Sequence, residues 1–123
     1  MAIQFTWNDK KNRINIQRHG IDFEDAKELF FSDYFEDVDD RKDYGEDRMV
    51  AIGYMHGQPI LVVYTQPAES LIHLISARAA LPHEEQKLLI NLAIKKQSGK
   101  LDRMHKKRKY LRKKKQDYGK WNE

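Results

Sequence analysis

The sequence contains no cysteine and only three prolines among 123 residues. Without cysteine there is no disulfide scaffold, no thiolate metal site and no cysteine nucleophile, and the composition fits a reducing compartment. No apolar run approaches the ~18 residues that cross a membrane, and the first residues lack the basic and apolar regions of a secretory signal. We therefore expect a cytoplasmic protein with no membrane contact.

Acidic and basic residues are distributed unevenly along the chain. The net charge is +4, but residues 95–123 carry 13 Lys and Arg against three acids, whereas residues 1–94 carry 10 against 16. The sequence thus predicts one domain over residues 1–96, which is long enough for one modest core. Residues 97–123 form a basic tail that we expect to be disordered or marginally helical when alone.

The first part of the domain predicts one short strand and two helices. Ile3–Thr6 is apolar enough for an edge strand. Asn8 is expected to cap a helix that ends at His19-Gly20, where glycine tolerates the left-handed conformation. Asp22 is the expected cap of a second, shorter helix.

The second part predicts an antiparallel meander and one more helix. Turns are expected at His56-Gly57 and Gln66-Pro67, and Pro82 suits the first turn of a helix that extends to about Lys96. Because the helices are segregated from the meander, the fold class is α+β. The expected strands are Tyr34–Val38, Met49–Tyr54, Ile60–Tyr64 (the central strand) and Leu71–Ala77.

Three residues of the domain suit chemistry on an RNA phosphodiester. A metal-free cut needs a base for the 2′-hydroxyl proton, cations for the charge on phosphorus and an acid for the leaving oxygen. His19 closes a helix, while Arg48 and Arg78 flank strands and can bind phosphate bidentately. Each also has a structural interpretation: His19 can satisfy the helix dipole, Arg48 can pair with nearby carboxylates, and Arg78 can pair with Glu84 or Glu85.

Other polar features are interpreted as structural. His73 lies in the middle of an apolar strand, so we expect a packed side chain rather than a base. The acidic stretch 36–47 is expected to be a solvated loop, since it lacks the residue spacing and mid-loop glycine of a calcium loop. The sequence has no Ser/His/Asp elbow, phosphate-binding glycine loop or zinc spacing. No metal or other cofactor is expected.

The basic tail is expected to bind nucleic acid without reading its sequence. Its cations can neutralise phosphates and release counterions, and Tyr110, Tyr118 and Trp121 can stack on unpaired bases. The alternatives are a solubilising tail or one that folds back on the acidic loop. The cations concerned are Lys106, Lys107, Arg108, Lys109, Arg112, Lys113, Lys114 and Lys115.

Three motifs between Phe5 and Glu84 together resemble the BrnT toxins of bacterial type II toxin–antitoxin systems. The first is Phe5-x-Trp7-Asn8, then Lys10 or Lys11 and Asn15, then Arg18-His19-Gly20-Ile21-x-Phe23-Glu24-x-Ala26. The second is Gly45-Glu46-x-Arg48 ahead of a strand with Ile52-Gly53. The third is Ile75-Ser76-Ala77-Arg78-x-Ala80, followed by Glu84.

The resemblance implies a small RelE-like domain and a metal-independent endoribonuclease that cuts RNA through its 2′-hydroxyl and inhibits translation. It implies a BrnA-type antitoxin as partner, with operator DNA contacted only through that antitoxin. By position, it implies His19 as base or acid and Arg48 and Arg78 as stabilisers of phosphate charge. The further candidates are Lys11 and Glu84 for catalysis and Arg18 for contact with the nucleic acid.

One departure from the family pattern supports an alternative function. Family members usually follow the matching glutamate with arginines and then a tyrosine, whereas Glu84 is followed by Glu85, Gln86, Lys87 and Leu88. The alternative is a catalytically weakened BrnT-like module that binds antitoxin and nucleic acid without cleavage. A third hypothesis is an interaction protein whose basic tail docks an acidic partner.

Overall fold

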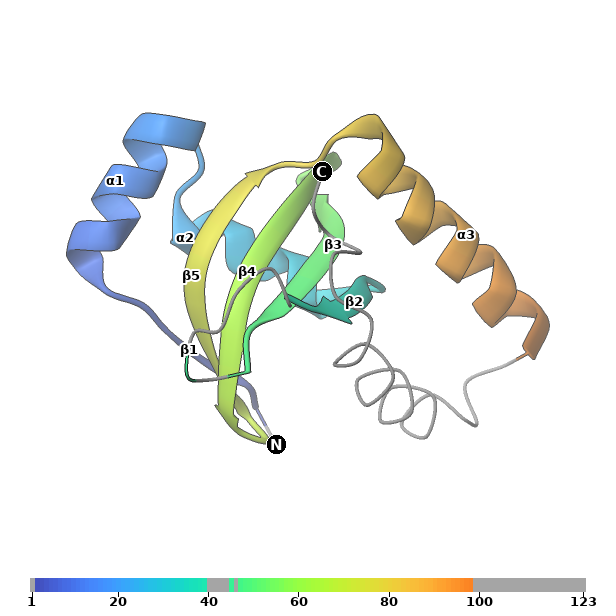
Figure 1. Cartoon of the computed structure of the whole chain (residues 1–123), viewed down its shortest axis with the longest axis horizontal. Helices are drawn as coiled ribbons and strands as arrows, with labels where there is room; N and C mark the ends of the chain where they lie inside the picture. Colours follow the sequence, from blue (N-terminus) through green and yellow to red (C-terminus); the bar gives the residue numbers. More distant parts are fainter. Residues whose placement is uncertain (1, 40–44, 46, 99–123) are drawn as a thin grey trace.

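The computed structural model describes residues 2–39, 45 and 47–98, and its centre is a five-stranded sheet (Figure 1). The strands lie in the order β1-β5-β4-β3-β2, so the predicted α+β class and the central position of β4 are confirmed. The elements are β1 (Gln4–Thr6), α1 (Asp9–His19), α2 (Phe23–Ala26), the 3-10 helix η1 (Lys27–Phe31), β2 (Phe35–Val38), β3 (Met49–Met55), β4 (Gln58–Ala68), β5 (Leu71–Ala79) and α3 (Pro82–Ser98).

Strands β2 to β5 form the predicted antiparallel meander, and β1 adds to its edge in parallel with β5. The prediction of a turn at Gln66-Pro67 was wrong, because β4 continues to Ala68. The register between β4 and β5 is irregular between Thr65 and Ala68. A proline is tolerated at such an irregularity because the ladder does not use its missing N–H. The turn at His56-Gly57 is present, with positive φ at both residues.

The predicted caps explain where the first helices begin and end. The Asn8 side chain accepts a hydrogen bond from the Lys11 backbone N–H at 3.0 Å, which satisfies an otherwise unpaired donor. Gly20 adopts φ 71° and donates its N–H to the Ile16 carbonyl, which closes α1. Asp22 caps α2, and the chain then continues as η1 rather than as one regular helix.

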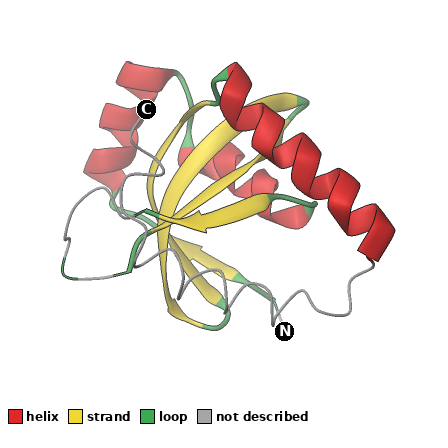
Figure 2. Cartoon of the chain, turned by 45° about the vertical axis from the view of Figure 1, so that its right-hand side comes forward, coloured by secondary structure: helices red, strands yellow, loops and turns green. Residues whose placement is uncertain are grey.

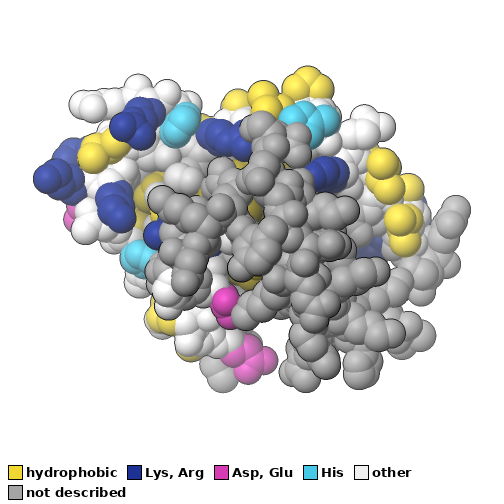
Figure 3. Space-filling model, viewed as in Figure 1, with side chains coloured by type: hydrophobic (Ala, Val, Ile, Leu, Met, Phe, Trp, Pro, Cys, Tyr) yellow, Lys and Arg dark blue, Asp and Glu magenta, His cyan; other side chains and the backbone are white. Residues whose placement is uncertain are grey.

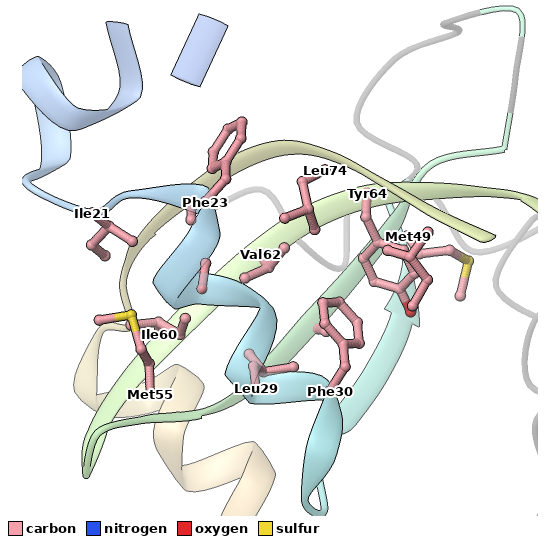
Figure 4. Close-up of a cluster of buried hydrophobic side chains, with 14 of the residues drawn as sticks. Ile21, Phe23, Leu29, Phe30, Met49, Met55, Ile60, Val62, Tyr64 and Leu74 are labelled. Atoms are coloured by element: carbon pink, nitrogen blue, oxygen red, sulfur yellow. The ribbon is translucent and has the colours of Figure 1, made fainter. Parts of the chain in front are cut away.

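Two apolar clusters hold the helices on opposite faces of the sheet (Figure 2). The larger one joins the sheet to α2 and η1, with Phe23, Leu29 and Phe30 directed at the strands (Figure 4). Gly53 permits close packing here, since a Cβ at this position would lie 2.8 Å from Leu29 Cγ. The second cluster joins the other face to α3. Its buried members are Val50, Ile52, Leu61, Val63 and Leu88.

Candidate functional site

A β-bulge in β5 decides which face of the sheet carries Arg78. Tyr64 pairs with Leu74 but Val63 pairs with Ser76, so Ile75 is an extra residue on β5. The extra residue reverses the alternation of side chains beyond it. Leu74 and Ala77 therefore both lie on the face of the sheet that α2 and η1 cover, called the α2 side below. Arg78, opposite Leu61, lies on the face that α3 covers, called the α3 side.

The bulge allows Arg78 to meet Glu84 in the first turn of α3. The guanidinium donates to both carboxylate oxygens, at 2.9 and 2.8 Å, and also to the Ala79 carbonyl at 3.1 Å. Glu84 is 1% exposed, whereas the side chain of Arg78 is 34% exposed. The structure therefore realises the ion pair that the sequence left as one interpretation of Arg78.

Glu84 also caps α3. Its carboxylate accepts the Leu81 backbone N–H at 2.8 Å, as the third helical residue does in a capping box. Burial favours a raised pKa for Glu84, but the hydrogen bonds from Arg78 and Leu81, together with the charge of Arg78, outweigh it. They hold the pKa of Glu84 below its ordinary value of 4.5. The carboxylate is thus fixed in its ionised form, which suits an anchor more than a proton donor.

Of the residues that follow Glu84, Leu88 has a packing role in this chain. Leu88, where the resemblance implies a tyrosine, is fully buried between α3 and the sheet. A phenol nevertheless lies near this turn, because Tyr54 of β3 donates to Glu85 Oε2 at 2.6 Å. This hydrogen bond raises the pKa of Tyr54.

A single asparagine fixes α1 to β5 next to Arg78. Asn15 is 5% exposed; its Nδ2 donates to the Ala77 and Ile21 carbonyls at 2.9 Å each, and its Oδ1 accepts the Ala77 N–H at 3.1 Å. Strand β1 pairs only with Leu71–His73, so the side chain of Asn15 satisfies the β5 backbone beyond the end of β1. The motif resemblance included Asn15, but nothing in its spacing revealed this bridging role.

The candidates on α1 line the side of the helix that Asn15 anchors. Lys11, Arg18 and His19 lie four, three and four residues from Asn15, spacings that share a helical face. All three side chains are exposed. Lys and Arg side chains gather over α1 in the space-filling view (Figure 3). The structure thus places these residues on the side of α1 that Asn15 attaches to β5, with His19 at the end of α1 that follows Asn15.

Arg48 lies on the same face of the sheet as Arg78 but farther along it. It directly precedes Met49, whose side chain belongs to the α2 side, so Arg48 is directed to the α3 side. Its carbonyl accepts the Asp39 N–H at 2.8 Å. From the strand register, its Cα lies roughly 16 Å from that of Arg78, four residues along and two strands across. The two arginines therefore occupy separate positions on one face of the sheet.

Sequence reasoning did not identify a polar row that crosses the sheet at the level of Arg48. Met49 pairs with Tyr64, so the preceding Arg48 stands at the level of the following Thr65. Thr65 pairs with His73 on β5, and His73 pairs with Thr6 on β1. Their neighbours Phe5, Ile72, Leu74 and Tyr64 all belong to the α2-side cluster. The row Arg48–Thr65–His73–Thr6 therefore lies on the α3 side. Only strand pairing reveals it, because its members come from four separate segments.

Several predictions concern residues beyond the described part of the chain. The basic tail cations from Lys106 to Lys115 lie outside it, as does much of the acidic loop. Among the described residues, no group of three or more His, Asp or Glu could hold a metal ion. None of the helices in the described part is long and apolar enough to cross a membrane.

Comparisons with known proteins assign the fold and these motifs to one family. The family model described as the BrnT ribonuclease toxin of type II toxin–antitoxin systems matches residues 7–84. The crystal structure of the Brucella abortus ribonuclease toxin BrnT matches with 32% identity and a TM-score of 0.51, covering 65% of this chain and 99% of that one. No curated protein matches the chain. The chain therefore belongs to the BrnT family of ribonuclease toxins of type II toxin–antitoxin systems.

Proposed function

We propose that this protein is a metal-independent endoribonuclease that inhibits translation as the toxin of a BrnT/BrnA-type pair. The observation that carries the proposal is the family match over residues 7–84, which contains Arg48, Arg78 and Glu84. The placement of both arginines on one face of the sheet supports it, since an RNA strand that lies across this face can reach both.

The proposed reaction is a transesterification within the RNA, in which the phosphoryl group moves from the 5′-oxygen to the 2′-oxygen. The 2′-hydroxyl loses its proton to a base, its oxygen attacks phosphorus, and the bond from phosphorus to the 5′-oxygen breaks as that oxygen takes a proton from water. Arg48 and Arg78 stabilise the charge that grows on the phosphate oxygens. Arg78 has five N–H donors, and the contacts described above use three, so two remain for a phosphate. Glu84 holds the guanidinium in place.

The candidates on α1 are proposed to contact the RNA strand next to this face. Lys11 and Arg18 supply positive charge, and His19 is a candidate for proton transfer. We further propose that the basic tail of residues 97–123 attracts RNA to a domain whose own net charge is negative. We propose that the toxin acts in the cytoplasm. The proposed partner is a BrnA-type antitoxin, through which the pair contacts operator DNA.

Expression of the wild-type chain is expected to arrest bacterial growth, and Arg48→Ala is expected to relieve that arrest. Removal of one preorganised charge donor costs about 10²- to 10³-fold in rate. The measurement is growth after induction, at matched soluble protein levels. Arg13→Ala is the matched control, because it also removes one arginine charge, but from an exposed position on α1 and not from the sheet face.

Co-expression of a BrnA-type antitoxin should restore growth of the wild type. Two results would count against the proposal: equal growth of wild type and Arg48→Ala, or equal arrest by both. The first result, combined with retained RNA binding, would favour the catalytically weakened binding module.

A further inference from the structure

We propose that His73 is a catalytic residue of this toxin, which contacts the scissile phosphodiester together with Arg48 and takes the proton of the 2′-hydroxyl. The inference rests on the proposed ribonuclease function and names a base within it. It reverses the expectation from the sequence, in which an apolar strand made His73 a packed side chain. The strand pairing and one hydrogen bond carry it.

The pairing of β3, β4 and β5 brings His73 and Arg48 to the same level of the same face. His73 pairs with Thr65, and Thr65 stands at the level of Arg48 in the β3–β4 register. Two strand spacings separate the two Cα atoms, about 10 Å. Thr65 is buried between them, whereas Arg48 and His73 are half-buried. A phosphate above Thr65 is therefore within reach of both longer side chains.

The contacts of His73 differ from those of a core histidine. Its Nδ1 forms a 2.9 Å hydrogen bond with Thr6 Oγ1 of the edge strand β1. Its Nε2 has no hydrogen-bond partner among the described residues. Ile72 and Leu74, on either side, pack into the α2-side cluster, which directs His73 away from that core. Thr6 thus orients the ring and leaves the second nitrogen available to a ligand.

The orientation by Thr6 suits a general base. In the tautomer whose Nδ1–H donates to Thr6 Oγ1, Nε2 carries the lone pair. Nε2 takes the proton of the 2′-hydroxyl, the 2′-oxygen attacks phosphorus, and the bond from phosphorus to the 5′-oxygen breaks. The leaving oxygen takes a proton from water. The products are a 2′,3′-cyclic phosphate and a 5′-hydroxyl, and the imidazolium returns its proton to solvent.

The two candidate histidines occupy different ends of the site. Asn15 anchors α1 at Ala77, next to Arg78, so His19 lies near the Arg78 end. His73 lies five residues earlier on β5, on the level of Arg48. Variants of the two histidines therefore test separate positions. A third histidine, His56, provides a matched control. Its Nε2 lies 3.2 Å from Glu28 Oε1 of η1, on the other side of the sheet.

The test combines cleavage kinetics with a direct measure of contact. We would measure the cleavage of a single-stranded RNA by the full chain with His73→Asn, His73→Gln, His19→Gln and His56→Gln. Asparagine can keep the hydrogen bond to Thr6 but lacks a group at the place of Nε2. In parallel, the imidazole resonances of the wild type would be followed during titration with a 2′-deoxy oligonucleotide of the same sequence, which cannot be cut.

We expect both His73 variants to lower kcat by about 10²- to 10³-fold at unchanged melting temperature, in the range typical of a general base. His56→Gln should retain full activity, and the His73 resonances should shift on titration. A wild type that cleaves while folded His73 variants cleave equally well would overturn the role of His73 and leave the ribonuclease function intact. A wild type that shifts the His73 resonances but cuts no RNA would overturn the ribonuclease function and the base together.

Discussion

Replacing Arg78 with alanine is expected to lower the free energy of unfolding by about 3–5 kcal/mol, because it leaves a buried carboxylate without its cation. Glu84 is 1% exposed and receives two hydrogen bonds from Arg78. A domain of this kind is stabilised by about 5–15 kcal/mol in total. The variant should thus lose a large share of its total stability, as measured by urea or thermal unfolding.

The double variant Arg78→Leu with Glu84→Leu separates the charge effect from the packing effect. It removes both charges at once, so it should be closer to the wild type in stability than Arg78→Ala is. Glu85→Gln is the matched control, since Glu85 is partly exposed and its carboxylate bonds to Tyr54 alone among the described residues. A loss below about 1 kcal/mol for Arg78→Ala would contradict the buried pair. Toxicity of Arg78→Ala is therefore compared with the wild type only together with its measured stability, because unfolding alone removes toxicity.

Asn15→Ala is expected to cost about 2–4 kcal/mol of stability and to loosen α1 from the sheet. The substitution removes the partners of three backbone groups, the N–H and carbonyl of Ala77 and the carbonyl of Ile21. Each buried polar group left without a hydrogen bond costs about 1–3 kcal/mol, and the total is reduced where water can enter. Chemical denaturation gives the stability, and hydrogen exchange at Ala77 reports the edge of β5 directly.

Asn12→Ala provides the matched control for Asn15 on the same helix. Asn12 is only half-buried and joins α1 to Asp22 and Phe23, at the start of α2 rather than at β5. Its replacement should cost about 1 kcal/mol and leave exchange at Ala77 unchanged. If the two variants had the same stability and the same rate of amide hydrogen exchange at Ala77, Asn15 would not be the residue that fixes α1 to β5.

The local features of this fold could be predicted from the sequence, because local chemistry determines them. Asn8 and Asp22 cap their helices and Gly20 ends α1 through groups only a few residues away. The apolar stretch around Val62 identifies the central strand through its composition alone. The parallel pairing of β1 with β5 could not be predicted in this way, since it joins residues about 67 positions apart in the chain.

The geometry of the candidate site depended on features with no local signal. Counting alternate residues from Leu74 places Arg78 on the α2 side; the extra residue at Ile75 places it on the α3 side instead. Pro67 indicated a turn but lies inside β4, because an irregularity in the ladder accommodates it. His73 was interpreted as a core residue because its strand is apolar. Its partner Thr6 and its level with Arg48 follow only from the pairing of separate strands.

The most direct test of the proposed function is RNA cleavage by the purified wild-type chain in excess EDTA, with the product ends mapped. We predict that cleavage continues without divalent ions, that it yields 2′,3′-cyclic phosphate and 5′-hydroxyl ends, and that one 2′-deoxy nucleotide at the cut position blocks it. Cleavage that EDTA abolishes, or products with 5′-phosphate ends, would contradict a metal-independent reaction through the 2′-hydroxyl. Intact RNA after incubation with folded, antitoxin-free protein would contradict the ribonuclease function itself.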